Sequence, residues 1–317
     1  MESGVGATRV VLDVDVGIDD AVAMVYLAGT HAIDIVGAGS VHGNCDTGTA
    51  SLNALRVLEV CGLTQVPVAV GAEGPLAGDA AYAAHVHGSD GLGDTGQPLP
   101  RRALEQESAW DQLVRIANAD PGKVDLLALG PLTNLAKALE VDGDVLRKFR
   151  RVVIMGGSGL EMSAGAVLEG DWNIIHDIEA AQMVFDSSEN ITMVGVNVTS
   201  PTVLGPNDLD LLERSETRPG RFVWQILQFY LDFYSVWWDR RTCSLHDPVA
   251  AGLLLDESYA LAEKTGPVEV IRRGVEARAL LRRSHRGPDV RVITSVDGAR
   301  FASDLARVIS EYSGNDA

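Results

Sequence analysis

Residues 10–20 read VVLDVDVGIDD, and this stretch carries more chemical information than any other part of the chain. Its four acids are Asp13, Asp15, Asp19 and Asp20. The segment at residues 9–12 predicts a short buried strand, and the apolar spacing at residues 19–29 predicts a helix. Helix capping accounts for two of the acids. Four carboxylates at one strand-to-helix junction repel one another, so we expect a hard cation with oxygen ligands to bind there.

Apolar segments alternate with helical patterns through the first two thirds of the chain. Further strands are predicted at residues 33–41, 66–70, 124–129, 152–155 and 191–198, and further helices at residues 50–61, from residue 132, and at residues 178–185. This alternation predicts an α/β fold, a single domain over residues 1–317 with a mostly parallel, Rossmann-like central sheet flanked by helices. A small C-terminal β-hairpin region is predicted within residues 267–297, before a closing helix.

Two long segments, at residues 72–108 and 158–176, interrupt this alternation. Long loops inside a compact domain are usually functional, so both are candidates for lining a site. Arginines also cluster between Arg272 and Arg291. Because no glycine-rich phosphate loop accompanies them, exposed hairpin edges or a subunit contact are favoured over a phosphate site.

The composition excludes several classes of partner. A formal net charge of −18 argues against electrostatic binding to nucleic acid or to an anionic membrane. The chain has neither a signal-peptide pattern at its start nor the run of about 18 apolar residues that spans a bilayer. Cys45, Cys61 and Cys243 are odd in number and widely separated, which favours reduced thiols. We therefore expect a soluble, cytoplasmic protein.

Several polar residues lie just after predicted strands or at the start of a predicted helix. They are Asn44 in VHGNCDT, Thr133 and Asn134 in LALGPLTNLA, Asp171 and Asn173 in EGDWN, and Asp247 in LHDPVA. Each has a local explanation, because Asn is common in turns and Thr and Asp are common helix caps. Strand ends of an open parallel sheet are nevertheless the usual ligand site. Taken together in this order, these residues indicate one functional site.

At these residues the chain resembles the nucleoside hydrolase family, the calcium-dependent inosine–uridine-type ribohydrolases. The opening motif of that family, DxDPGxDD, is matched here by DVDVGIDD, and its HDP-type motif is matched at residues 246–248. LGPLTNLA and the MGG at residues 155–157 are also similar to the family. The resemblance extends from Val10 to beyond Asp247. It implies hydrolysis of the N-glycosidic bond of ribonucleosides to ribose and a free base.

The resemblance also implies a role for each matched residue. One Ca²⁺ would be held by Asp15, Asp20 and Asp247 and by the backbone carbonyl of Thr133. Asp15 would also take a proton from a water on the Ca²⁺, and His246 would protonate the departing base. Three of the implied substrate-binding residues, Asp19, Asn44 and Asn173, would hold the ribose hydroxyls. The other implied substrate-binding residues are His87, Met155, Asp171 and Tyr234. For Tyr234, simple packing on a helix is an equal alternative to base stacking.

The chain departs from the family pattern in three places. Val16 replaces the proline of DxDPG, DWN at residues 171–173 replaces the usual EFN, and an asparagine that is common near Gly165 is missing. The resemblance would place the last two changes near the sugar 5′-hydroxyl. We therefore expect a looser or altered grip on the 5′ end of the sugar.

Two other functions stay open on the sequence alone. Phosphatases of the haloacid dehalogenase type, which use Mg²⁺, also place DxD after a first strand, but they need a downstream lysine and acidic pair that are not evident here. A non-catalytic nucleoside- or ribose-binding protein would keep the metal site. The base is not assigned: a histidine donor favours inosine–uridine or pyrimidine types, whereas Trp172 and Trp237 leave purine stacking possible. The family habit implies a homodimer or homotetramer.

Overall fold

The computed structural model describes residues 7–160, 171–273, 276–282 and 284–314. Its strands are β1 (Thr8–Val14), β2 (Ile33–Ser40), β3 (Val68–Ala69), β4 (Val124–Ala128), β5 (Val152–Met155), β6 (Gly159–Leu160), β7 (Ile191–Val194), β8 (Ala260–Gly266), β9 (Val268–Arg273), β10 (Glu276–Leu281) and β11 (Val290–Val296). Within these ranges the main sheet has the order β3-β2-β1-β4-β5-β7-β11-β8, and a small sheet has the order β6-β10-β9. In the main sheet only β8 runs antiparallel to its neighbour.

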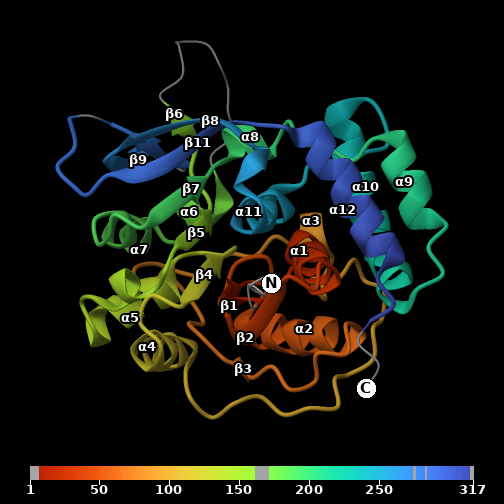
Figure 1. The fold of residues 1–317 in the computed structure, drawn as a ribbon, viewed down its shortest axis with the longest axis horizontal. Coiled ribbons are helices and arrows are strands. Elements are labelled where there is room, and N and C mark those ends of the chain that lie inside the picture. Colours follow the sequence, from red (N-terminus) through yellow and green to blue (C-terminus); the bar gives the residue numbers. More distant parts are fainter. Residues whose placement is uncertain (1–6, 161–170, 274–275, 283, 315–317) are drawn as a thin grey trace, which may run out of the picture.

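Helices cover both faces of the main sheet, as Figure 1 shows. They are α1 (Ile18–Gly29), α2 (Thr47–Val60), α3 (Ala84–His87), α4 (Ala109–Ala119), α5 (Thr133–Val141), α6 (Trp172–His176), α7 (Ile178–Phe185), α8 (Val196–Thr199), α9 (Pro206–Glu213), α10 (Arg218–Trp238), α11 (His246–Leu255) and α12 (Gly298–Glu311). On one face lie α1, α2, α11 and α12, and on the other lie α4, α5 and α7 (Figure 1). The predicted single-domain α/β fold with a mostly parallel sheet is confirmed. No helix of the described residues is long and apolar enough to cross a membrane.

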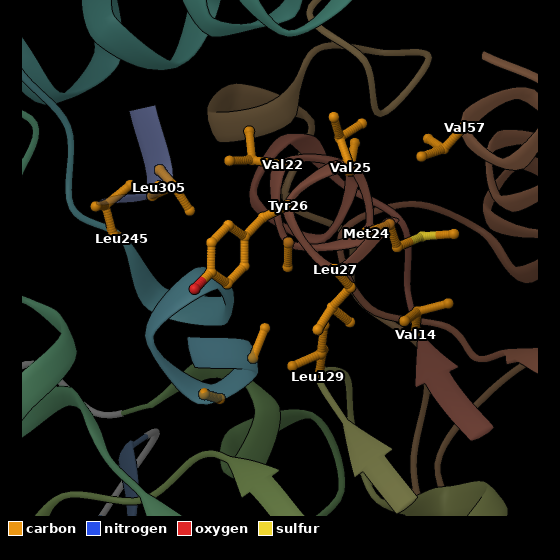
Figure 2. Packing of buried hydrophobic residues seen from close by; sticks show 14 of the residues in the cluster. Val14, Val22, Met24, Val25, Tyr26, Leu27, Val57, Leu129, Leu245 and Leu305 are labelled. Carbon is orange, nitrogen blue, oxygen red and sulfur yellow. The ribbon is translucent and has the colours of Figure 1, made fainter. Parts of the chain in front are cut away.

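The core is built around β1 and α1. Residues 10–14 of β1 are all buried, as expected for a parallel strand covered on both faces. Every residue from Ile18 to Ala28 of α1 is buried as well. Figure 2 shows Val25, Tyr26 and Leu27 of this helix surrounded by apolar side chains from other elements. Burial of one such side chain contributes about 1.5–3 kcal/mol, so this packing fixes the junction between β1 and α1 firmly.

Two sequence predictions need correction. The strand expected at residues 191–198 ends at Val194, and residues 196–199 form the helix α8. The chain turns there because the Val196 N–H donates to the Gly157 carbonyl at 2.8 Å, a contact between distant segments. The strand expected at residues 66–70 is only two residues long.

The predicted C-terminal hairpin is confirmed as the antiparallel pair β9 and β10. The next strand, β11, does not extend this hairpin but joins the main sheet between β7 and β8. Its Arg291 forms ion pairs with Glu263 at 2.6 Å and Glu257 at 3.5 Å. This pairing fits the structural interpretation of the arginine cluster.

Candidate active site

The topology brings the predicted site residues to one edge of the main sheet. The chain leaves β1, β2, β4 and β5 at their carboxyl ends, which lie on the same side because these strands are parallel. The segments after these strands carry Asp15, Asp19, Asp20, Asn44 and Thr133. The helix α11 packs against α1 and begins with His246 and Asp247.

Three buried carboxylates form a group that could hold a metal ion. Oxygen atoms of Asp19, Asp20 and Asp247 all lie within 4.8 Å of one another. Among the described residues, neither Oδ1 of Asp19 nor Oδ1 of Asp20 has a hydrogen-bond partner. A buried carboxylate oxygen without a partner is costly, and a cation would compensate that cost. Because the donor set is oxygen only, it fits a hard divalent ion such as Ca²⁺ or Mg²⁺.

Burial raises the pKa of each of these acids. The pKa of Asp20 rises to about 7, because of burial first and the neighbouring charge of Asp19 second. The pKa values of Asp15 and Asp247 are raised well above the usual range by burial and by nearby carboxylates. Burial also raises the pKa of Asp19, although His246 acts against this shift. The cluster therefore resists carrying several negative charges without a cation.

Asp15 is held beside this group by the segment that follows β2. The Asn44 backbone N–H donates to Asp15 Oδ2 at 2.8 Å, and the Asn44 Nδ2 donates to Asp15 Oδ1 at 3.2 Å. The same Nδ2 donates to Asp20 Oδ2 at 3.0 Å. A side chain at Gly43 would overlap Asp15 Oδ2, so only glycine permits this approach. Val16, in place of the proline of the family motif, is buried and leaves these contacts intact.

Thr133 begins α5 at the same edge, and its hydroxyl joins two residues that sequence analysis did not find. Thr133 Oγ1 donates to Asp177 Oδ2 at 2.7 Å and lies 3.1 Å from His42 Nε2. Asp177 caps α7, which is the only sequence signal that it gives. His42 lies in the VHGN segment, two residues before the predicted site residue Asn44. All three side chains are buried.

His246 lies between two hydroxyl groups. Thr199 Oγ1 is 2.8 Å from its Nδ1, and the Tyr234 hydroxyl is 2.8 Å from its Nε2. Burial lowers the pKa of His246, and the nearby charge of Asp19 opposes this shift. A neutral imidazole has one donor and one acceptor, so one hydroxyl must donate to the ring and the other must accept from it. Tyr234 therefore does more than pack on α10.

His87 lies on the other side of Asp19. Its Nδ1 accepts a hydrogen bond from the Ile18 N–H at 3.1 Å and lies 3.8 Å from Asp19 Oδ1. Burial lowers the pKa of His87 to about 3, so the ring is neutral and its proton is on Nε2. The Tyr230 hydroxyl donates to Asp19 Oδ2 at 3.2 Å. Sequence analysis missed Tyr230, although it lies one helical turn before Tyr234.

The residues of the EGDWN motif contact backbone groups at the ends of β4 and β5. Asn173 Nδ2 donates to the Leu129 carbonyl at 2.6 Å and to the Met155 carbonyl at 3.2 Å. Asp171 Oδ1 accepts from the Asn173 N–H at 2.8 Å, and Asp171 Oδ2 accepts from the Gly157 N–H. Both carboxylate oxygens of Asp171 therefore accept hydrogen bonds from backbone N–H groups. The missing asparagine near Gly165 falls outside the described residues.

The two tryptophans considered for base stacking are both exposed. Trp172 has 52% of its surface exposed and meets the rings of His85 and His176 edge-on. Trp237 is 62% exposed, near the end of α10. Neither tryptophan has a ring contact with His246 among the described residues.

Known proteins match nearly the whole chain. A family model described as inosine-uridine preferring nucleoside hydrolase matches residues 10–303. Uridine nucleosidase 1 of Arabidopsis thaliana is 37% identical over 268 residues, which are 84% of this chain and 79% of that protein. The inosine-uridine preferring nucleoside hydrolase of Crithidia fasciculata is 31% identical over 264 residues, 83% of each chain.

A solved structure agrees with these matches. The plant nucleoside hydrolase PpNRh1 enzyme has a TM-score of 0.88 and 33% identity to this chain, with 96% of this chain and 99% of that one covered. Neither the phosphatase nor the non-catalytic binding protein finds support in these similarities. This chain belongs to the nucleoside hydrolase family, whose members hydrolyse ribonucleosides to ribose and a free base.

Proposed function

We propose that this nucleoside N-ribohydrolase uses Ca²⁺ and that the buried acids at the junction of β1 and α1 perform its chemistry. The observation that carries the proposal is the convergence of the Asp19, Asp20 and Asp247 carboxylates, two of which have an oxygen without a hydrogen-bond partner among the described residues. When bound, Ca²⁺ would lower the pKa of a coordinated water and orient the ribose hydroxyls. From the family resemblance we assign Asp15, Asp20, Asp247 and the Thr133 carbonyl as its ligands. Of the three converging acids, Asp20 and Asp247 would then hold the ion and Asp19 would lie beside it.

We assign Asp15 as the general base. Its two hydrogen bonds from Asn44 fix the orientation of the carboxylate beside Asp20. Asp19 instead accepts a hydrogen bond from the Tyr230 hydroxyl of α10 and lies beside the His87 ring of α3. This difference supports a separate role for Asp19 at the ribose 2′- and 3′-hydroxyls.

The proposed reaction agrees with the charges of the site. Cleavage of an N-ribosidic bond builds positive charge on C1′ and on the ring oxygen, which buried carboxylates stabilise. His246, held by Thr199 and Tyr234, would supply a proton to the leaving base. His87 would offer its Nε2 proton to the substrate, and Asn44, Asn173 and Met155 would line the sugar site. Because the similar proteins are named for uridine and inosine, we propose these two nucleosides as substrates.

Location and assembly belong to the same proposal. We infer a cytoplasmic enzyme from the odd, widely spaced cysteines, and a homodimer or homotetramer from the family resemblance. Light scattering on the purified protein would measure its mass in solution. A monomer at micromolar concentration would contradict the inferred assembly.

Replacement of Asp15 tests the catalytic assignment. We expect Asp15→Asn to lower kcat by about 10²–10⁴-fold at saturating Ca²⁺, because the base is lost. Its Tm should change little, because the amide relieves repulsion from Asp20 and Asp19 but loses one of the two hydrogen bonds from Asn44. The matched control is Asp125→Asn, at a fully buried acid in β4 that pairs with Arg150 at 2.6 Å and Arg151 at 2.8 Å.

The control should show the opposite behaviour. Asp125→Asn removes a paired charge far from the site, so Tm should fall while kcat is unchanged. If Asp15→Asn kept more than about a tenth of the wild-type kcat, Asp15 would not be the base.

A further inference from the structure

Asn53 lies in the middle of α2 and is fully buried. Its side chain forms hydrogen bonds to two other segments of the chain. Its Nδ2 donates to the Val16 carbonyl at 3.2 Å and to the Asp90 carbonyl at 2.8 Å. Asparagine is a poor residue for a helix interior, because its side chain competes for backbone hydrogen bonds. The two hydrogen bonds offset this loss of helix stability, because they join α2 to two other segments.

The two segments that Asn53 joins both belong to the candidate site. Val16 follows Asp15 in the turn that carries the site acids. Asp90 lies three residues after His87, in a stretch at residues 88–94 that contains neither helix nor strand. The segments touch directly at Gly91, where φ is +74° and an added Cβ would lie 2.8 Å from Asn53 Nδ2 and 3.1 Å from the Val16 carbonyl.

The orientation of the Asn53 amide is fixed by Arg56. Arg56 Nη1 donates to Asn53 Oδ1 at 2.6 Å, and Arg56 Nε donates to the Pro98 carbonyl at 3.0 Å. An arginine can only donate, so it must face the amide oxygen. The amide nitrogen therefore points at Val16 and Asp90. The thiol of Cys45 also donates to the Val16 carbonyl, at 3.8 Å, but a thiol is a weak donor.

We propose that Asn53 is a positioning residue that holds His87 against the acid-bearing turn. His87 itself is attached to that turn by one hydrogen bond, from the Ile18 N–H to Nδ1. Asn53 provides the second attachment, three residues further along the same segment. Together they fix the direction in which the His87 Nε2 proton points. This inference rests on the proposed function, in which His87 binds the nucleoside.

The test compares Asn53→Ala with a variant that loses the same kind of bond elsewhere. Asn190 also donates from Nδ2 to two carbonyls, those of Leu146 at 2.9 Å and Phe149 at 2.8 Å, remote from the site. We expect both variants to lower Tm. Asn53→Ala should raise KM for uridine by about tenfold, the value of one lost buried hydrogen bond, with a smaller change in kcat. Asn190→Ala should leave KM unchanged.

A double-mutant cycle with His87→Ala shows whether Asn53 acts through His87. In the His87→Ala background, Asn53→Ala should change KM by less than about twofold, because the group that it positions is gone. An equal factor in both backgrounds, or the same behaviour as Asn190→Ala, would overturn the inference. A wild-type enzyme that released no base from any nucleoside would contradict the proposed function instead.

Arg56→Ala provides a second route if Asn53→Ala does not fold. This change keeps Asn53 but frees its amide to rotate. We expect a rise of about threefold in KM for uridine, again absent in the His87→Ala background. An Arg56→Ala enzyme with wild-type KM would count against the proposal.

Discussion

At the scale of single residues, the two hydroxyls around His246 determine what the imidazole can do. Thr199 contacts Nδ1 and Tyr234 contacts Nε2, so both ring nitrogens are engaged before substrate binds. The pKa of His246 is lowered by burial, so its proton is easily given up once acquired. A leaving base that cannot depart as an anion needs that proton.

The proposed role of His246 as general acid predicts that its replacement affects substrates differently according to their leaving group. With uridine, we expect His246→Ala to lower kcat by about 10²–10⁴-fold. With 4-nitrophenyl riboside, whose leaving group departs without a proton, the loss should be less than about tenfold. Steady-state kinetics on both substrates give the answer. Equal losses on the two substrates would remove His246 from the role of acid.

Asp171 leads to a prediction about the sugar. Both of its oxygens accept backbone N–H groups, from Asn173 and Gly157, so neither is free to grip a substrate hydroxyl strongly. We expect 5′-deoxyuridine to keep kcat/KM within about a hundredfold of uridine. A much larger loss would show a site built around the 5′-hydroxyl. The control is 2′-deoxyuridine, which should lose far more because Asp19 holds that hydroxyl in the proposed function.

At the scale of elements, the junction of β1 and α1 couples stability to pH. The folded-state pKa values of Asp13 and Asp20 are both about 7, mainly because of burial, whereas free aspartate titrates near pH 3.8. Such acids bind more protons in the folded state than in the unfolded state over this range. Their contribution to stability is complete below pH 3.8 and is lost as the pH rises through 7.

Buried histidines act in the opposite direction, but only at lower pH. Burial lowers the pKa of His87 to about 3 and of His176 to about 4, from 6.5. Their effect on stability is complete above pH 6.5. Between pH 6.5 and about 8, the carboxylates therefore dominate, and the Tm of metal-free protein should fall as the pH rises.

Added Ca²⁺ should reverse that trend. A bound cation stabilises the ionised carboxylates electrostatically. The rise in Tm on adding Ca²⁺ should therefore be larger at about pH 8 than at about pH 6.5. Differential scanning fluorimetry after chelation and dialysis measures both effects. Asp247→Asn should reduce the Ca²⁺-induced shift, whereas Asp125→Asn should not. A metal-free Tm that increased from pH 6.5 to 8 would contradict the assignment.

The elements also show what a sequence pattern can and cannot predict. β1, β5 and α7 were predicted within a few residues, because their apolar periodicity and turn residues are local. The helix α8 is not predicted by its sequence, because the chain turns there through a hydrogen bond from the Val196 N–H to the Gly157 carbonyl, which is distant in the sequence. The roles of Tyr230 and Asn53 are not predictable for the same reason. Tyr230, for example, donates to Asp19, which lies 211 residues away in the sequence. Side chains that position a site look like ordinary helix residues until the fold places their partners.

At the scale of the whole molecule, the parallel sheet explains why the acids, the amides and the histidines meet. Residues from the ends of β1, β2, β4 and β5 assemble along one edge, and α11, which packs beside α1, adds His246 and Asp247 (Figure 1). The helices α3 and α10 then bring His87 and the tyrosines to the same place. The order of motifs along the chain reflects this geometry, which is why the motifs predict the family and also bring together the residues proposed for the site.

The most direct test of this account is the release of ribose and free base from uridine and inosine, measured with and without chelator. We expect ribose and base to appear in equal amounts, to stop when metal is removed, and to resume on adding Ca²⁺. Release that continued unchanged after metal removal would contradict the assigned role of the acid cluster. Failure to release any base from either nucleoside, with metal present, would contradict the proposed substrates.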